Sequence, residues 1–460
     1  MLTSKFGRLD GRHRPGAALT PRTRSRWSTW PRTCACALVW FCAASALAGC
    51  IHAPKWVAQR NVTTDMVAQA LDEPPTAERR VKPAEIPEIP PRTNLRPCCA
   101  FGTELRATLG PVPIPFFSID NVISADQLGP HMYDSGAFAT EGSSQKNAYT
   151  SEDNGILYTC RGGFIDTAHV RDYADWTLFW SAAIARSMET GGTVAIPPEG
   201  GHRRVHLKPV PTELIEHYGL RRLSIKMGQW VAFQLSIWHE IVTWYGWSSI
   251  EAYPEYVSAF SPEDLYSNLL GIKIAGGLLS NAGSAETDSL YDHSMDQWLP
   301  MSLAYLQPVS VKAGNEATHL VDGVWWNSKA RLPDPHLVLR RNFDITEFIK
   351  PWLISDAYTS PEMQAWINRE CGGQQSPLVL QRPRPPQGFE FLDYLTVEID
   401  VDVPDPFPFP RPGSTQITQA DFPAIIHSIR QESAGKFGPG SDRPQRMPNE
   451  LAAAPTESPR

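Results

Sequence analysis

The sequence lacks the signature motifs of the common enzyme classes. Its 460 residues contain no G-x-S-x-G turn, no phosphate-binding loop and no G-x-G-x-x-G turn, which mark many hydrolases, nucleoside triphosphatases and dinucleotide-binding enzymes. Excess positive charge is lacking as well, because 42 lysines and arginines face 49 aspartates and glutamates and the formal net charge is −7. This charge balance gives no basic footprint that would indicate nucleic-acid binding, so we expect no nucleic-acid partner.

An apolar run long enough to span a membrane is also absent near the N-terminus. A spanning helix needs about 20 apolar residues, whereas the run there covers residues 33–48. It follows a leader with seven arginines between Arg8 and Arg32, and it ends in Leu47-Ala48-Gly49-Cys50. A basic leader, a short apolar run and small residues before a cleavage site are the layout of a secretory signal. The ending resembles the bacterial lipobox, whose cysteine becomes an acylated N-terminus.

This resemblance predicts that residues 1–49 are a lipoprotein signal peptide and that Cys50 carries acyl chains such as palmitate. The membrane is then a partner through the lipid anchor. Because Ile51 rather than Asp follows the cysteine, we expect an outer-membrane protein that faces the periplasm. A plain secretory signal and a single membrane anchor are the alternatives.

Four cysteines remain after the signal and the lipidated residue, and they are Cys98, Cys99, Cys160 and Cys371. An exported protein meets an oxidising compartment, so two disulfides are possible. Adjacent cysteines form a strained ring, which predicts a disulfide from Cys160 or Cys371 to Cys98 or Cys99. Buried thiols are the alternative. A zinc site at Cys98-Cys99 is disfavoured, because no two-residue gap separates the sulfurs.

Proline frequency divides the rest of the chain, which has 42 prolines concentrated in its flanks. Proline-rich segments with interspersed charges favour extended conformations and lack the apolar mass to fold alone. We therefore predict a lipid-anchored, proline-rich tether over 50–97, a single globular domain over 98–437 and a disordered tail over 438–460.

Hydrophobic periodicity predicts a mainly α-helical α+β domain, with a helical core and a small β-hairpin or sheet. The predicted helices cover 165–188, 226–245, 262–280, 289–306 and 418–431. Two β-type runs, 193–196 and 202–207, flank a Pro/Gly turn and predict a hairpin. Further strands are expected at 337–339 and 394–403.

The predicted helix 226–245 is apolar nearly all round, which is typical of a buried helix. Ser236, His239, Glu240 and Thr243 nevertheless fall on one stripe about 100° wide. An unpaired buried charge is costly. This polar stripe therefore needs partners from other side chains, a metal or a substrate.

Two other predicted helices carry similar polar faces. Asp166, His169 and Tyr173 follow i, i+3/i+4 spacing in the helix 165–188, although Asp166 could instead cap that helix. Asp264 and Asn268 lie on a face of small and polar residues in the helix 262–280, where Asp264 could also be part of a cap. Burial would direct these faces toward one another, so we predict that His169 and His239 share one polar cluster.

Two hypotheses follow for this cluster. In the first, a buried hydrogen-bond network locks the core of an envelope protein with a binding or structural role. In the second, the protein is a metal-assisted hydrolase that acts on an envelope polymer, peptide or lipid; His169 and His239 bind a divalent metal, and Glu240 and Asp264 are catalytic. His239-Glu240 begins like the zincin motif H-E-x-x-H, but Thr243 occupies the place of the second histidine.

Three segments, 160–172, 238–247 and 260–271, together resemble an uncharacterised family of bacterial lipoproteins, a domain of unknown function. The resemblance extends over residues 97–437. It implies an envelope location and a shared domain. It implies no established activity and no catalytic residue.

Overall fold

The computed structural model describes residues 61–72, 88–97, 99–109, 112–115, 118–136, 138–139, 152–249, 255–281, 288–373, 375–404, 406–411 and 413–446. All of them belong to the second of two structural units, Val57–Arg460. The predictions about the signal peptide, Cys50 and Cys98 lie outside the described residues.

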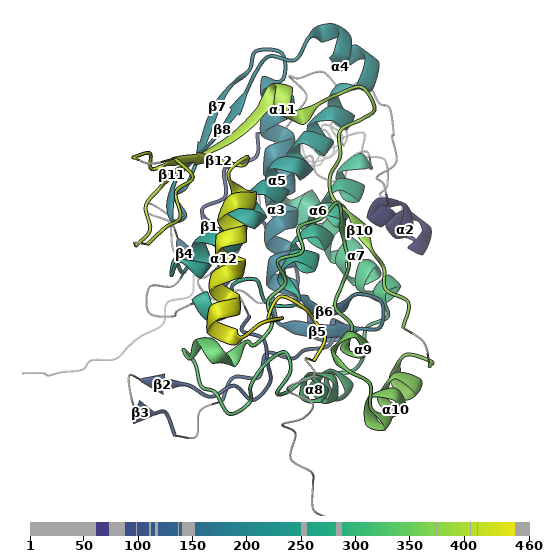
Figure 1. Cartoon of the computed structure of the whole chain (residues 1–460). Coiled ribbons are helices and arrows are strands. Elements are labelled where there is room, and N and C mark those ends of the chain that lie inside the picture. The colour runs from purple at the N-terminus through teal and green to yellow at the C-terminus, as the bar shows by residue number, and fades with distance from the viewer. Residues whose placement is uncertain are drawn as a thin grey trace, which may run out of the picture. The chain divides into compact units, whose positions relative to one another are not determined.

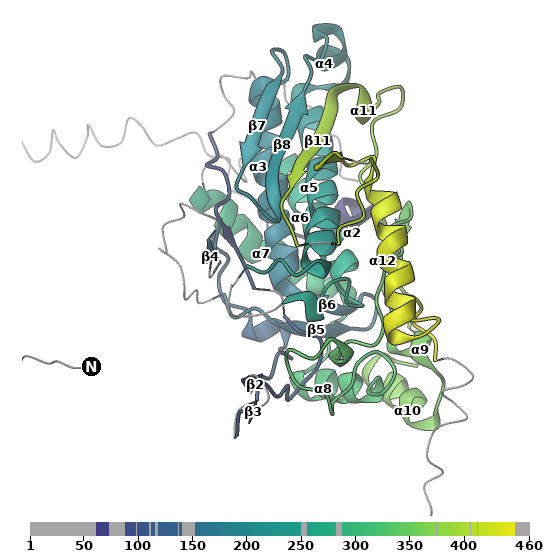
Figure 2. The same ribbon diagram turned by 60° about the vertical axis from the view of Figure 1, so that its left-hand side comes forward.

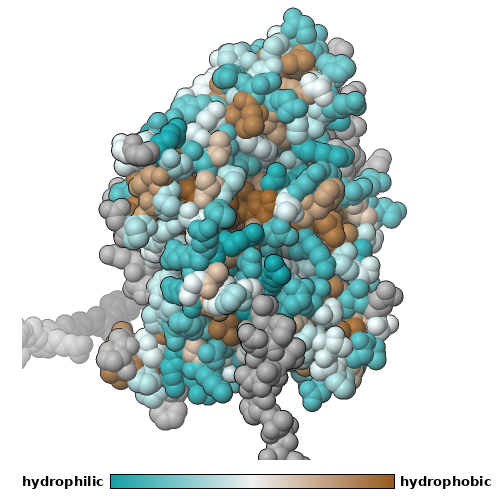
Figure 3. All heavy atoms as spheres, viewed as in Figure 1, coloured by the Kyte–Doolittle hydropathy of each residue, from teal (hydrophilic) through white to brown (hydrophobic). Residues whose placement is uncertain are grey.

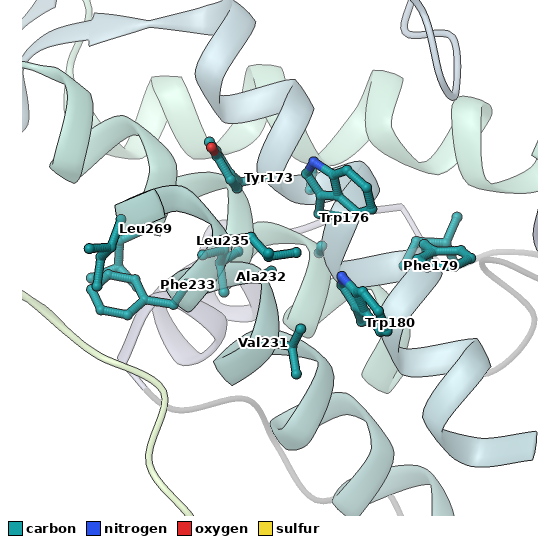
Figure 4. Close-up of a cluster of buried hydrophobic side chains, with 14 of the residues drawn as sticks. Tyr173, Trp176, Phe179, Trp180, Val231, Ala232, Phe233, Leu235 and Leu269 are labelled. Atoms are coloured by element: carbon teal, nitrogen blue, oxygen red, sulfur yellow. The ribbon is translucent and has the colours of Figure 1, made fainter. Parts of the chain in front are cut away.

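Three buried helices form the centre of the fold (Figure 1). They are α3 (Thr167–Ser187), α5 (Leu220–Trp244) and α6 (Asp264–Ser280), and each packs against the other two. Small residues allow close approach: a Cβ atom on Gly271 of α6 would lie 2.0 Å from the carbonyl oxygen of Val170 on α3. Figure 4 shows the aromatic contacts nearby, where Trp176 and Trp180 of α3 stack with ring centroids 6.4 Å apart.

A four-stranded antiparallel sheet adjoins these helices (Figure 2). Its order is β12 (Gln416–Thr418), β11 (Leu395–Val401), β8 (Gly201–Leu207) and β7 (Gly192–Ile196). Buried and less buried residues alternate along β8 and β11, and the buried apolar side chains join the same hydrophobic core as the central helices. The β7–β8 pair is the hairpin expected from the sequence. Its turn at Glu199 lies against α5, because the Trp238 indole N–H donates to the Glu199 carbonyl oxygen at 2.7 Å.

Shorter elements complete the described fold, which is mainly helical α+β as predicted. The further helices are α2 (Thr64–Asp72), α4 (Thr212–Tyr218), α7 (Asp288–Leu306), α8 (Val311–Leu320), α9 (Ile354–Ala357), α10 (Pro361–Glu370), α11 (Phe391–Tyr394) and α12 (Phe422–Phe437). The two-stranded pairs are β5 (Ile156–Thr159) with β6 (Gly163–Asp166), β1 (Asn94–Leu95) with β4 (Phe138–Ala139), β2 (Thr108–Leu109) with β3 (Val112–Pro113), and β9 (Phe348–Ile349) with β10 (Leu380–Gln381).

Both flanks of the predicted domain contain more structure than the sequence indicated. Helix α2 packs on α6 and α7, and its Asp72 carbonyl accepts from the Lys273 ammonium at 2.7 Å, so the tether predicted over 50–97 is wrong at this helix. The predicted tail 438–460 is also ordered in part, because the Trp325 indole donates to the Pro444 carbonyl at 2.9 Å. Residues 447–460 lie outside the described residues.

Three element predictions need correction. The helix expected from residue 165 begins at Thr167, because Asp166 ends β6 and caps α3. The strand expected at 337–339 is wrong, since Pro335–Leu337 forms a 3-10 helix. The last helix begins at Phe422 rather than 418, because Thr418 pairs with Glu398 of β11.

The disulfide joins Cys160 to Cys371 across 211 residues of sequence. The predicted pairing of either residue with Cys98 or Cys99 is therefore wrong, and Cys99 is a free cysteine. Cys160 follows β5 and Cys371 ends α10, two elements that meet only through the tertiary fold. No local spacing rule could have indicated this pair.

Buried ion pairs attach residues 92–96 to α3. Arg96 contacts Glu152 at 2.6 Å, Asp172 at 2.7 Å and Asp175 at 3.0 Å, and Arg92 contacts Asp172 at 2.6 Å. All five side chains are at most 5% exposed. Arg92 and Arg96 lie in the segment predicted to be a solvated tether. In the structure they neutralise buried carboxylates, whose charge would otherwise be costly in the core.

These ion pairs predict acid-labile stability. Burial alone would raise the pKa of the Glu152 carboxyl, but the charge and hydrogen bond of Arg96 outweigh burial and lower its pKa to about 2. The folded pKa then lies below the ordinary value, so the stabilisation is complete above about pH 4.5 and is lost as the pH falls toward 2. We expect urea unfolding between pH 6 and pH 3 to show this loss, and Glu152→Gln to flatten the pH dependence. A variant with the wild-type pH dependence would contradict the role of Glu152.

Candidate functional site

Two histidines and a glutamate meet between α3 and α5. His169 comes from α3, and His239 and Glu240 come from α5. One ligand atom from each residue lies within 4.8 Å of the other two, and all three side chains are buried. The imidazole centroids are 5.6 Å apart and the rings meet edge to face. The structure thus contains a buried His/carboxylate cluster, with both predicted metal ligands in it.

Glu199, in the turn between β7 and β8, orients His239. Its carboxylate lies 2.5 Å from the His239 Nδ1 atom. Since a carboxylate accepts, Nδ1 donates, and Nε2 becomes the ring atom that can bind a ligand. Burial disfavours the charged imidazole, but the hydrogen bond and charge of Glu199 outweigh burial and raise the pKa of His239 to about 9.

Arg203 of β8 holds Glu199 in turn. Its guanidinium pairs with the other carboxylate oxygen of Glu199 and donates to the Pro197 carbonyl at 2.8 Å. It also lies over the Trp176 ring, 5.6 Å from the centroid. The sequence predicted the hairpin turn but not Glu199, because a turn residue carries no periodicity that shows where its side chain points.

Glu240 accepts two hydrogen bonds from different elements. The Phe260 backbone N–H donates to one carboxylate oxygen at 2.7 Å, and the Asn268 side-chain amide donates to the other at 3.4 Å. Phe260 has φ 57°, in the left-handed region that is unusual for a bulky residue. The loop before α6 therefore adopts an uncommon conformation that directs this N–H toward Glu240.

A second group of carboxyls, from Glu263 and Asp264, lies beside the cluster of His169, His239 and Glu240. Asp264 of α6 is 3.4 Å from His169 Nδ1. Burial and the charges of Glu240 and Glu263 raise the pKa of Asp264 well above its ordinary value, and burial raises the pKa of Glu263 to about 8. The buried Arg341 guanidinium interacts electrostatically with Asp264 and Glu263, and burial lowers its pKa to about 10. Burial of these carboxyls so close together thus favours their protonated, neutral forms.

Some polar atoms in this region have no hydrogen-bond partner among the described residues. They are Glu263 Oε2, Asn268 Oδ1 and Thr243 Oγ1, and all three side chains are buried. A buried oxygen without a partner costs about 1–3 kcal/mol. Each of these oxygens is able to accept a hydrogen bond from water or to bind a cation.

The other predicted members of the cluster have more local contacts. Asp166 caps α3 and accepts from the Ala168 N–H at 2.7 Å and the Cys99 N–H at 3.1 Å. The Tyr173 ring contacts the edge of His169, with centroids 6.4 Å apart. Ser236 donates to the Phe233 carbonyl of its own helix at 2.8 Å, which is a helix-internal role. Asp166 also accepts from the His169 N–H at 3.4 Å, so Asp166 and Tyr173 contact the cluster, whereas Ser236 bonds within its own helix.

The fold and the site define a mainly helical α+β protein with a buried His/carboxylate cluster. The chain belongs to the family described as Protein of unknown function (DUF4056), whose model matches residues 86–355, more than half of the chain. No curated protein and no solved structure matches the chain. Among the described residues, no helix has both the length and the apolar character required to span a membrane.

Proposed function

We propose that this protein binds a divalent transition-metal ion through His169, His239 and Glu240. The observation that carries the proposal is the approach of three ligand atoms from two helices to within 4.8 Å of one another. Zinc bonds of about 2.1 Å require ligand atoms about 3–4 Å apart. Small side-chain rotations would therefore bring all three ligand atoms to bonding distance from one ion. Two imidazoles with a carboxylate are a common donor set for zinc.

The surroundings of the three ligands support a cation rather than a neutral core. Glu199 fixes the His239 ring as a carboxylate typically does behind a metal-bound histidine. The carboxyl groups of Glu263 and Asp264 would gain a positive neighbour. The partnerless oxygen of Asn268 would gain either a cation or a metal-bound water.

A metal-assisted hydrolase of an envelope polymer, peptide or lipid is the second candidate function. Three protein ligands leave a position on a tetrahedral ion for water, and a metal-bound water is a nucleophile near neutral pH. Asp264, 3.4 Å from His169, would position that histidine or accept a proton. A binding or structural role in the envelope requires no ion, because a buried hydrogen-bond network would lock the core by itself.

Metal removal tests the proposal. We expect the purified full chain to contain about one equivalent of metal by elemental analysis, and EDTA to lower the midpoint of thermal unfolding. Readdition of zinc should restore it, because a ligand at 100 times its dissociation constant stabilises by about 2.7 kcal/mol. His239→Ala should abolish the response to zinc, whereas His293→Ala, at an exposed position on α7, should retain it.

Two results would contradict this assignment. One is a wild-type protein that contains no metal and whose midpoint of thermal unfolding does not change when zinc is added. The other is a His169→Ala, His239→Ala double variant that still binds one equivalent of zinc.

We also propose that the protein is a lipoprotein of the cell envelope, anchored through Cys50. Its Ile51 neighbour favours the outer membrane. The basic leader, the short apolar run and the lipobox-like ending support this location. The Cys160–Cys371 disulfide is consistent with an oxidising compartment.

Cys50→Ser tests the anchor. We expect the variant to leave the membrane fraction or to accumulate as an unprocessed precursor, because the acylated cysteine is gone. Cell fractionation followed by intact-mass spectrometry measures both results, with Cys99→Ser as the control that stays membrane-bound. A Cys50→Ser protein with wild-type fractionation and mass would contradict lipidation.

A further inference from the structure

A cavity of about 540 Å³ lies between α5 and α12, away from the residues assigned to the metal. Its apolar lining includes Trp230 and Ile237 of α5, Phe422 and Ile426 of α12, and Phe343. Figure 3 shows hydrophobic side chains gathered in a hollow on the face that carries α12, with hydrophilic residues around them. The volume is within the range of ligand pockets, about 300–1,000 Å³.

Arg382 gives this apolar cavity a cationic wall. Its guanidinium donates to the Ile345 carbonyl at 3.3 Å and lies over the Phe233 ring, 5.4 Å from the centroid. Within the part of the chain that the structure describes, no carboxylate lies within ion-pair distance of Arg382. Burial lowers the pKa of Arg382, with Glu347 as the opposing charge. A half-buried guanidinium of this kind retains donors for an anion.

Arg430 adds a second cation to the same wall. It donates to the Phe343 carbonyl at 3.1 Å, and its Nε atom is 3.6 Å from Asp442, which does not line the cavity. Asp344 is the acidic residue in the lining. The lining therefore combines apolar walls with two arginines and one acidic residue. Because Asp442 pairs with Arg430 from outside the lining, Arg382 is the cation that is left for a ligand.

We infer that this cavity binds an amphiphilic anion, with an apolar chain against Trp230, Ile237 and Phe422 and a carboxylate or phosphate head group on Arg382. Charge complementarity selects the head group, because guanidinium donors match the planar geometry of a carboxylate and the oxygens of a phosphate. Burial of the ligand's apolar chain supplies the rest of the affinity. The inference is independent of the metal proposal, since the two sites share no side chain.

Quenching of tryptophan fluorescence tests the inference directly. The probe is 11-bromoundecanoate, added to the purified full chain below its critical micelle concentration. We expect saturable quenching in the wild type and loss of most of it in Trp230→Phe, because Trp230 lines the cavity. Arg382→Gln should raise the dissociation constant about tenfold, as expected for losing one charge-assisted hydrogen bond. Arg411→Gln, an exposed arginine outside the cavity, is the matched control and should bind like the wild type.

The head group is tested by competition. Decanoate and decyl phosphate should displace the probe, and the tighter of the two identifies whether a carboxylate or a phosphate is the natural head group. Decanol and decyltrimethylammonium should displace it at least tenfold less effectively. The inference is overturned if these neutral and cationic analogues compete equally well, if Arg382→Gln binds with wild-type affinity, or if Trp230→Phe retains the full quenching.

Discussion

Replacing Arg96 with methionine is expected to lower the free energy of unfolding by about 3–5 kcal/mol, the range for breaking a buried ion pair by removing one partner. Arg96 donates to Glu152 through two nitrogens, at 2.6 and 2.8 Å, and also contacts Asp172 and Asp175. Methionine fills similar space but leaves three buried carboxylates with one cation fewer. Urea unfolding followed by circular dichroism at pH 7 measures the change.

Arg369→Met is the matched control. Arg369 contacts Glu316 and Glu370, but its side chain is 55% exposed. Exposed ion pairs contribute about 0–1 kcal/mol, so this variant should unfold nearly like the wild type. Equal destabilisation by both substitutions would show that the buried pairs around Arg96 have no special role.

The central helices were predictable because their sequences are apolar on almost every face. A run such as residues 230–242 in α5 has no stable position except inside a core, and its few polar residues then stand out. His239, Glu240, His169, Asp264 and Asn268 were identified in this way. The structure brings all five into contact with one another or with a shared neighbour.

The residues that support this cluster were not predictable by the same reasoning. Glu199 is in a turn, where no periodic pattern indicates which way a side chain points. Arg92 and Arg96 are in a proline-rich segment whose composition indicates a solvated tether, yet they contact α3 carboxylates about 80 residues away in sequence. Charge pairing across such separations depends on the tertiary fold, which composition does not encode.

The cavity beside α12 shows a further limit of sequence patterns. Phe422 and Ile426 follow helical spacing within the predicted helix 418–431. Periodicity indicates which face is apolar. It does not indicate whether the facing helix fills the space, so the cavity could not be predicted.

Removing the Cys160–Cys371 disulfide is the second change with a large expected effect. In the double variant Cys160→Ser, Cys371→Ser, we expect the free energy of unfolding to fall by about 2–5 kcal/mol, the usual range for a native disulfide. The separation of 211 residues places the expectation toward the upper end, because the lost constraint on the unfolded chain grows with loop length. Urea unfolding with and without dithiothreitol measures the effect, and reductant should destabilise the wild type but not the double variant.

Cys99→Ser separates this effect from the loss of any thiol. Burial and the neighbouring Asp166 raise the pKa of the Cys99 thiol well above its ordinary value, so it is a poor thiolate and a poor partner for disulfide exchange. Its substitution should leave the response to dithiothreitol unchanged. Alkylation of unfolded, unreduced protein should label Cys99 and spare Cys160 and Cys371. Labelling of Cys160 and Cys371 together would show that the bond is absent, and the expected stability loss would then have no basis.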